Sequence, residues 1–178
     1  MNSNRLGLTD STAIVFTSDH GYHLGDHTFW QKANLHEQVT RVPLIIAAPG
    51  VKPGRSRSLV QLVDIFPTLC ELTGAPVPAS VEGKSLVPVL RDPAATVHEA
   101  AFSYVQGGHH ALRTDRWAYM RYTDGTEELY DMKADPGQFT NLAKNAAHTA
   151  ALETLRQQLD QRVKASGDGA GKKKKARQ

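Results

Sequence analysis

The sequence has a single cysteine, Cys70, and no long apolar run among its 178 residues. One cysteine cannot form an internal disulfide, which excludes a small scaffold held together by disulfides. No stretch reaches the roughly 20 apolar residues of a membrane-spanning helix, and no segment after Met1 resembles a signal peptide. The chain must therefore be stabilised by an ordinary hydrophobic core, for which its length and its 40% hydrophobic residues suffice.

The sequence also lacks an extended basic surface. Its net charge of +3 depends on a Gly-rich tail that contains the run Lys172–Lys175 and Arg177. Without this tail the charges are close to balanced, so the composition does not indicate a nucleic-acid-binding protein. We expect the tail, residues 167–178, to be a disordered solubilising segment, with binding to an acidic partner as the alternative.

The most informative segment is residues 12–32, which read TAIVFTSDHGYHLGDHTFWQK. Its apolar run, residues 13–16, is typical of a buried strand, and the run stops abruptly before the polar residues 18–21. In open α/β sheets, ligands bind at the carboxyl ends of parallel strands. The segment therefore predicts a ligand-binding site at the end of a buried strand in a parallel sheet.

Asp19 and His20 are the candidate metal ligands in this segment. Neighbouring side chains in a regular strand point to opposite faces, so the two can share a metal ion only where the strand has ended. Gly21 supplies the backbone freedom for that break. Calcium prefers about six to eight oxygen ligands, so zinc and manganese are alternatives, and further ligands must come from elsewhere. The competing interpretation is that Asp19 caps a loop and His20 is a surface turn residue.

A second apolar run, VPLIIAA at residues 42–48, predicts another strand buried on both faces. Asp64 is placed to cap a helix that Gly74 ends, and this helix would bury one apolar face.

From about residue 101 the pattern changes to short segments rich in aromatic and β-branched residues, with a tight-turn signal at Asp124-Gly125. These segments predict a small antiparallel sheet. A terminal helix then carries four apolar residues on one face: Leu152, Leu155, Leu159 and Val163.

Taken together, these motifs resemble the sulfatase branch of the alkaline phosphatase superfamily, closest to the iduronate sulfatase and choline sulfatase type. The motifs that carry the resemblance are the strand with its Asp-His-Gly, the Gly25-Asp26-His27 loop, Trp30 and Lys32, and later Arg113–Trp117, Glu128–Asp131, Asp135-Pro136 and Thr140–Leu142. The resemblance covers residues 6–166.

The resemblance implies an α/β fold. Residues 1–95 would be the C-terminal part of an alkaline-phosphatase-like parallel sheet core, with the metal and sulfate loop. Residues 96–166 would form a small antiparallel subdomain with a terminal helix, and residues 167–178 the tail.

The resemblance also implies roles for the site residues. Asp19 and His20 would hold Ca²⁺ beside two earlier aspartates, and Lys32 would contact the sulfate group. A compact ammonium suits one anionic oxygen and stabilises charge that develops on a leaving group. The alternative for Lys32 is a solvated surface lysine. His27 is a second candidate for substrate binding, with a structural role as its alternative.

Three further histidines keep open roles. His36 is interpreted as structural or as part of a pocket rim. His109 and His110 follow two glycines and open a predicted strand, which would allow one imidazole to lie near a pocket mouth.

The nucleophile segment of a sulfatase is missing from this sequence. Sulfatases use a Cys or Ser in a Cys/Ser-x-Pro-x-Arg segment, which is converted to formylglycine. Cys70 is followed by Glu-Leu-Thr, so it does not fit and is expected to be a buried helix residue, and no Ser-x-Pro-x-Arg is present. The resemblance implies that Met1 falls inside a structural element. It also implies that the chain alone binds substrate poorly and turns over nothing, because the nucleophile and half of the metal ligands lie upstream.

The expected function is that of the carboxyl-terminal portion of a sulfuric ester hydrolase. Its substrate would be a sulfated small molecule or polysaccharide. The sequence does not indicate the oligomeric state or the cellular compartment. One alternative is a phosphatase or phosphodiesterase of the same superfamily, because tetrahedral anions of similar size fit related sites. The other alternative is a non-catalytic fragment or interaction module. Binding of Ca²⁺ that depends on Asp19 distinguishes a functional half-site from such a module.

Overall fold

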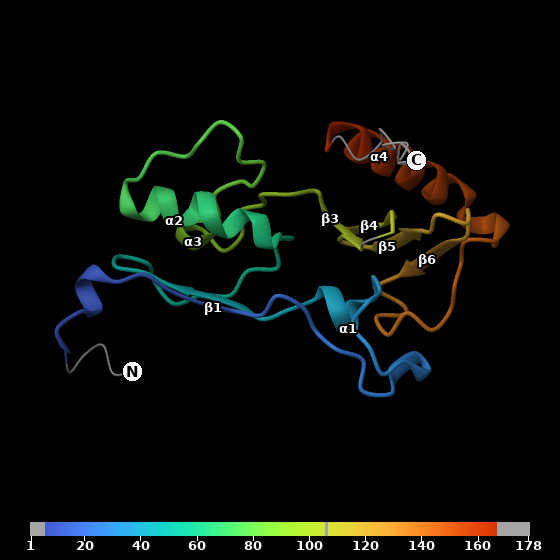
Figure 1. Cartoon of the computed structure of the whole chain (residues 1–178), viewed down its shortest axis with the longest axis horizontal. Helices are drawn as coiled ribbons and strands as arrows, with labels where there is room; N and C mark the ends of the chain where they lie inside the picture. The colour runs from blue at the N-terminus through green and yellow to red at the C-terminus, as the bar shows by residue number, and fades with distance from the viewer. Residues whose placement is uncertain (1–5, 106, 167–178) are drawn as a thin grey trace, which may run out of the picture. The chain divides into compact units, whose positions relative to one another are not determined.

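The computed structural model describes residues 6–105 and 107–166, so the tail predicted at residues 167–178 lies outside the described residues (Figure 1). The chain forms two compact units. The first consists of Met1–Lys32 and Glu37–Ala101, and the second of Ala33–His36 and Phe102–Gln178. The predicted domain boundary between residues 95 and 96 stays a prediction. No helix in the described ranges is long and apolar enough to cross a membrane.

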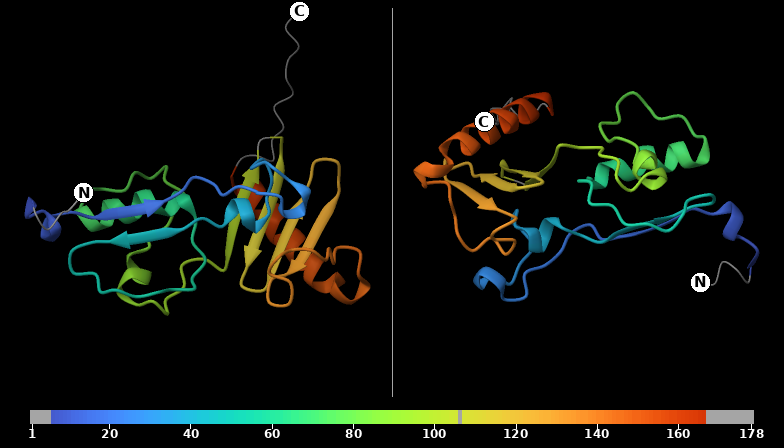
Figure 2. Two further views of the ribbon diagram at one scale, coloured as in Figure 1. Left: turned by 90° about the horizontal axis from the view of Figure 1, so that it is seen from below. Right: turned by 180° about the vertical axis from the view of Figure 1, so that it is seen from behind.

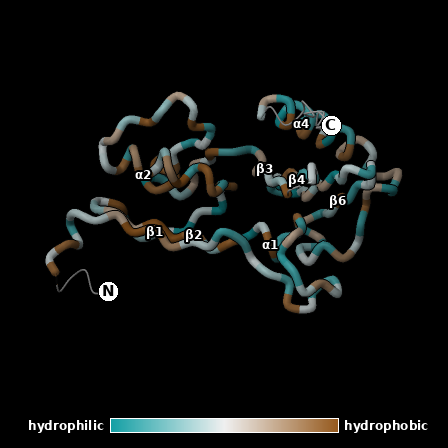
Figure 3. Tube along the Cα trace, viewed as in Figure 1, coloured by the Kyte–Doolittle hydropathy of each residue, from teal (hydrophilic) through white to brown (hydrophobic). Residues whose placement is uncertain are grey.

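The first unit contains two strands, β1 (Ile14–Thr17) and β2 (Leu44–Ala47), at the two apolar runs of the sequence (Figure 3). β1 and β2 pair antiparallel, so they are not parallel neighbours in the implied sheet core. An apolar run indicates burial, but it carries no information about the direction of the neighbouring strand.

One face of this strand pair is also more exposed than the sequence predicts. Phe16 and Ile45 lie opposite each other in the register and therefore share a face. Their exposed fractions are 60% and 61%, and Ile14 on the same face is 50% exposed. The described residues of this chain therefore do not bury both faces of the β1–β2 pair.

The helical elements of the first unit are short. They are the 3-10 helices η2 (Thr9–Ser11), η3 (Asp26–Thr28) and η4 (Leu62–Asp64), and the α-helices α1 (Glu37–Thr40), α2 (Ile65–Thr73) and α3 (Val87–Arg91). Gly74 ends α2 in a left-handed conformation, as predicted, and Cys70 is buried within that helix.

Asp64 is fully buried, and its carboxylate connects three segments. It accepts hydrogen bonds from the backbone N–H of Gln61 at 2.7 Å and of Lys84 at 2.9 Å. The His98 ring nitrogen Nε2 lies 2.9 Å from the same carboxylate. Asp64 thus caps η4, which leads into α2, rather than α2 itself. A buried carboxylate is tolerated because several donors satisfy it.

The second unit is a four-stranded sheet with the order β3-β4-β5-β6. Its strands are β3 (Ala100–Val105), β4 (His109–Thr114), β5 (Trp117–Arg121) and β6 (Glu127–Asp131), and β5 is antiparallel to both β4 and β6. The predicted antiparallel sheet is confirmed. The predicted turn is confirmed as well, since Gly125 has a φ of +84° and its N–H donates to the Tyr122 carbonyl at 3.1 Å.

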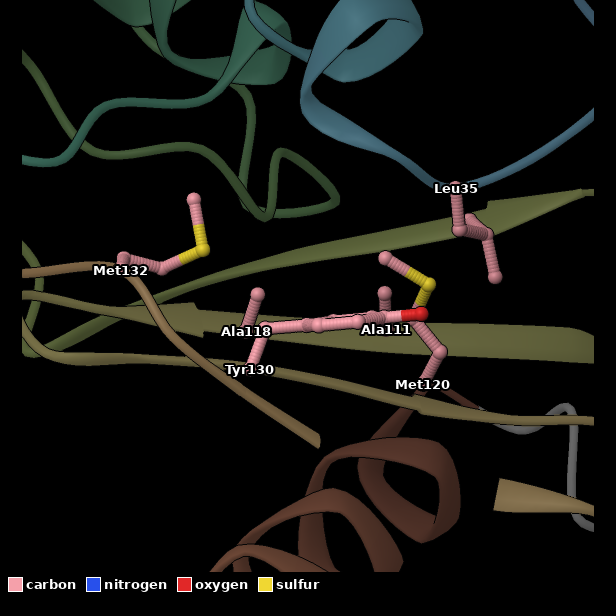
Figure 4. Close-up of a cluster of buried hydrophobic side chains, with 6 residues drawn as sticks. All are labelled: Leu35, Ala111, Ala118, Met120, Tyr130 and Met132. Atoms are coloured by element: carbon pink, nitrogen blue, oxygen red, sulfur yellow. The ribbon is translucent and has the colours of Figure 1, made fainter. Parts of the chain in front are cut away.

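Both faces of this sheet are covered. The helix α4 (Thr149–Ala165) follows the 3-10 helix η5 (Ala146–His148) and packs on one face, where it buries three of the four predicted apolar residues (Figure 2). Those residues are Leu152, Leu155 and Leu159. On the other face, Leu35 packs against apolar side chains of the sheet and of Met132, just after β6, and together they form a buried cluster (Figure 4). The cluster consists of Leu35, Ala111, Ala118, Met120, Tyr130 and Met132.

A bidentate ion pair joins α4 to the sheet. Arg156 donates to both carboxylate oxygens of Glu127 in β6, and Tyr119 donates its hydroxyl to the same carboxylate. The hydrogen bonds from Arg156 are the main cause that holds the pKa of Glu127 below its ordinary value, against the opposing effect of desolvation.

This pair makes the stability of the second unit depend on pH. Because the folded-state pKa of Glu127 is lowered, its stabilisation is present above the unfolded-state pKa of about 4.3 and is lost as the pH falls through the folded-state value. We predict that Glu127→Gln lowers the free energy of unfolding by about 1 to 3 kcal/mol near neutral pH. The variant should also lose less stability than the wild type when the pH falls from about 5 to about 3.

Urea unfolding followed by circular dichroism at several pH values measures both effects. Glu153→Gln is the matched control, because Glu153 also contacts Arg156 but is 55% exposed, so its loss should cost at most about 1 kcal/mol. Equal stability losses for the two variants would contradict the assignment.

Candidate functional site

The candidate site lies on a long excursion from the strand pair of the first unit. Thr17 at the end of β1 lies opposite Leu44 at the start of β2, so residues 18–43 leave and return at the same end of the two strands. The excursion is closed near its base, where the Gly21 N–H donates to the Val39 carbonyl at 2.8 Å.

Gly21 is required by this close approach rather than by an unusual backbone angle. A Cβ atom at Gly21 would lie 2.0 Å from the backbone oxygen of Gln38 and 3.3 Å from the Cα of Val39. No side chain fits at such distances, so only glycine allows the turn after His20 to lie against α1.

The next ten residues fold back on themselves as a narrow loop. The His23 N–H donates to the Gln31 carbonyl, and the Gly25 N–H donates to the Phe29 carbonyl, each at 3.0 Å. These two bonds bring the end of the loop back beside its start. The thirteen-residue spacing between Asp19 and Lys32 thereby becomes a spatial contact.

Lys32, His20 and Asp19 are brought together by this closure. The Lys32 ammonium donates to His20 Nε2 at 2.7 Å, and the Asp19 carboxylate oxygen Oδ2 lies 3.5 Å from the same nitrogen. His20 Nδ1 lies 2.8 Å from the Gly21 carbonyl oxygen, which can only accept, so Nδ1 carries the proton. The lone pair of His20 therefore sits on Nε2, directed at the charged groups.

Asp19 keeps most of its carboxylate accessible, with 84% of its side chain exposed. The His20 N–H donates to Asp19 Oδ1 at 3.0 Å. Desolvation acts to raise the pKa of Asp19, but its electrostatic interaction with the His20 ring, backbone hydrogen bonds and the charge of Lys32 together hold it below the ordinary value. The carboxylate is thus ionised and available to a cation.

The donor set fits part of a metal site. Asp19 provides carboxylate oxygens, and His20 provides a lone pair whose orientation is fixed by the hydrogen bond from its other nitrogen, as is usual for a metal-binding histidine. Among the described residues, no group of three or more His, Cys, Asp or Glu side chains could hold a metal ion. Within residues 6–105 and 107–166, the site therefore offers two protein ligands.

His27 lies on the same narrow loop. It has a left-handed backbone with a φ of +55°, and its ring packs edge-on against His23 with centroids 5.8 Å apart. The part it plays in substrate binding stays a prediction.

The other candidate histidines belong to the second unit. His36 is 5% exposed and its Nε2 lies 3.3 Å from a carboxylate oxygen of Glu128. The ring of His110 stacks on Phe102, and His109 Nδ1 accepts a hydrogen bond from the Thr123 N–H at 3.3 Å. These contacts place all three imidazoles in or beside the antiparallel sheet, and a position of one of them at a pocket stays a prediction.

Comparison with known proteins places the chain in a family. A family model described as N-sulphoglucosamine sulphohydrolase, C-terminal, matches residues 25–165. The chain belongs to this sulfatase family. The predicted resemblance to the carboxyl-terminal portion of a sulfatase is therefore confirmed.

Several curated sulfatases are similar to the chain. A protein named sulfatase from Formosa agariphila is 36% identical over 147 residues, which are 82% of this chain and 29% of that protein. The choline-sulfatase of Rhizobium meliloti is 36% identical over 167 residues, covering 89% of this chain and 32% of the relative. The chain thus spans about a third of the length of the sulfatases that it matches.

Solved structures agree with the fold. A protein in complex with its substrate D-glucosamine-2-N,6-O-disulfate matches 97% of this chain and 38% of its own chain, with a TM-score of 0.87 at 32% identity. The phosphonate monoester hydrolase of Silicibacter pomeroyi matches 92% of this chain, with a TM-score of 0.80 at 29% identity. The α/β fold class, part of an alkaline-phosphatase-like core followed by a small antiparallel sheet and a terminal helix, is confirmed.

His23 is the residue of this sulfatase loop that sequence reasoning missed. It is fully buried, its Nδ1 lies 3.1 Å from the Asp26 carbonyl oxygen, and its ring packs edge-on against Phe29 at 5.5 Å. In the sequence its neighbours Tyr22 and Leu24 are the more apolar residues, yet they are exposed and His23 is buried, so apolar pattern gave no signal. The loop that carries Lys32 thus has a small core of its own.

We predict that Gly21→Ala disturbs the sulfatase site through the backbone. The added methyl group must displace the Gln38 carbonyl, and such overpacking costs about 1 to 3 kcal/mol. The unfolding free energy should fall by that amount, and the backbone ¹⁵N shifts of His20 and Lys32 should move. Gly54→Ala is the control, because its Cβ would meet only two ring atoms of Pro93, at 3.0 and 3.9 Å, and no backbone atom. Unchanged stability and shifts in Gly21→Ala would contradict the close approach.

Proposed function

We propose that this chain forms part of the site of a sulfate-ester hydrolase, and that Lys32 binds an oxygen of the sulfate group. The observation that carries the proposal is the contact of the Lys32 ammonium with His20 Nε2 at 2.7 Å, beside the ionised Asp19. A lysine held at a strand end presents a compact positive charge, which stabilises the charge of a tetrahedral anion and of a departing group.

Asp19 and His20 are proposed to hold Ca²⁺ in that site. The carboxylate is a ligand that Ca²⁺ prefers, and the remaining oxygens would come from residues outside this pair. Bound Ca²⁺ would supply positive charge next to the sulfate oxygens. Asp19 would anchor the cation beside His20, which the Gly21 carbonyl holds in position. Lys32, which contacts His20 Nε2 in this structure, would then donate to the anion.

The proposed substrate class is a sulfated small molecule, in particular a sulfated sugar. Support comes from the similar structure that holds D-glucosamine-2-N,6-O-disulfate, which matches nearly the whole of this chain. A polysaccharide that carries such a residue at its end is included in this class.

A second candidate function is hydrolysis of a phosphonate or phosphate ester. It is favoured by the match to a phosphonate monoester hydrolase, at a TM-score of 0.80. Sulfate and phosphonate groups are tetrahedral and of similar size, so Lys32 would serve both. A sulfate monoester and a phosphonate monoester each carry one negative charge near neutral pH, so the comparison below distinguishes the two functions by turnover rate.

A chimeric enzyme tests the proposal. Residues 14–166 would replace the matching segment of the choline-sulfatase of Rhizobium meliloti, and release of sulfate from choline sulfate would be measured. We predict an active chimera in which Lys32→Ala lowers the rate at least about 100-fold. Lys52→Ala, which changes an exposed lysine of another loop, should leave the rate unchanged.

The same chimera tests the metal and the second candidate. Removal of divalent cations with EDTA should abolish activity and Ca²⁺ should restore it, with Asp19→Asn requiring roughly tenfold more Ca²⁺. Faster turnover of a phosphonate monoester would favour the second function. A folded but inactive chimera, or equal rates for Lys32→Ala and the parent, would contradict both. A smaller graft of residues 18–32 gives the same readout if the large one does not fold.

A further inference from the structure

An exposed tryptophan stands on the loop that carries the candidate anion site. The side chain of Trp30 is 70% exposed. Its indole rests beside Gly25, where three of its atoms lie 3.4 to 3.9 Å from the position that a Cβ would take. Gly25 has a φ of +104° and carries no side chain, so nothing at that position pushes the ring away.

The backbone beneath this ring is well fixed. The Tyr22 hydroxyl donates to the Trp30 carbonyl at 2.7 Å. The hydrogen bond from His23 to the Gln31 carbonyl lies next to it, and the buried His23 ring packs inside the loop. A large aromatic ring that is both exposed and held in place loses little conformational freedom when a ligand covers it.

Trp30 is also close to the anion site along the chain. It lies two residues before Lys32, and two residues span at most about 7 Å. The two Cα atoms therefore lie within about the width of one sugar ring of each other, which is the spacing that a shared ligand requires.

We propose that Trp30 is the platform on which the pyranose ring of a sulfated sugar stacks while its sulfate binds Lys32. This subsite rests on the proposed function and names a residue that selects the carbohydrate part of the substrate. The apolar C–H face of a pyranose matches the flat indole. A quaternary ammonium would also bind an indole face, but the Lys32 charge two residues away repels a cation and favours the uncharged sugar ring.

Trp30 fluorescence provides a direct test on the full chain. The chain has two tryptophans, so Trp117→Phe leaves Trp30 as the only one. This variant would be titrated with D-glucosamine-2-N,6-O-disulfate, with D-glucosamine, with choline sulfate and with inorganic sulfate. We expect the disulfated sugar to change the Trp30 emission at a concentration at least about tenfold lower than the other three require.

Substitutions on the same loop distinguish the effect of the Trp30 ring on binding from the effect of any exposed apolar side chain. Trp30→Ala should weaken binding of the disulfated sugar, measured by calorimetry, about threefold to tenfold, and Trp30→Phe should restore most of it. Leu24→Ala is the matched control, because Leu24 is 74% exposed on the same loop but has no flat ring. Its affinity should equal that of the parent chain.

The outcomes distinguish the subsite from the proposed function. Sugar binding that is lost in Lys32→Ala but unchanged in Trp30→Ala, without a change in Trp30 emission, would overturn the subsite and leave the anion site intact. A stronger response to choline sulfate than to the sugar would show that Trp30 binds a cationic group, and this would also overturn the subsite. No Lys32-dependent binding of the sugar or of sulfate would contradict the proposed function itself.

Discussion

The approach of Gly21 to the backbone of α1 is the contact on which the candidate site depends. A Cβ at Gly21 would lie 2.0 Å from the Gln38 oxygen, and the Gly21 N–H donates to Val39 at 2.8 Å. The same residue fixes His20, because its carbonyl oxygen accepts the proton of Nδ1. One glycine therefore closes the base of the excursion from β1 and orients the imidazole that faces Lys32.

The loop of residues 22–32 has a small core of its own, and its folding brings Lys32 into contact with His20. His23 fills the interior of the loop, and the two backbone bonds between its arms return Lys32 to His20. The same loop carries the exposed Trp30, two residues before Lys32. Anion binding and recognition of the rest of the substrate would thus depend on one short, rigid segment in a sulfatase fold of which this chain spans the carboxyl-terminal part.

Features that follow from local pattern were predictable from the sequence. The two apolar runs, the turn at Gly125 and the apolar face of α4 all appear where the sequence places them. The antiparallel pairing of β1 with β2 was not predictable, because it depends on the path of residues 18–43. The buried Asp64–His98 pair was missed for a similar reason, since its partners are 34 residues apart and neither position has an apolar pattern.

The tautomer of His20 is the measurement that tests this account most directly. A long-range ¹H–¹⁵N correlation spectrum of the labelled chain, at a pH where the imidazole is neutral, distinguishes the two nitrogens. The structure predicts a proton on Nδ1 and a lone pair on Nε2, which accepts from Lys32 here and which a cation would take in place of Lys32. A proton on Nε2 would leave no acceptor for Lys32, and it would contradict both the closed loop and the proposed sulfate site.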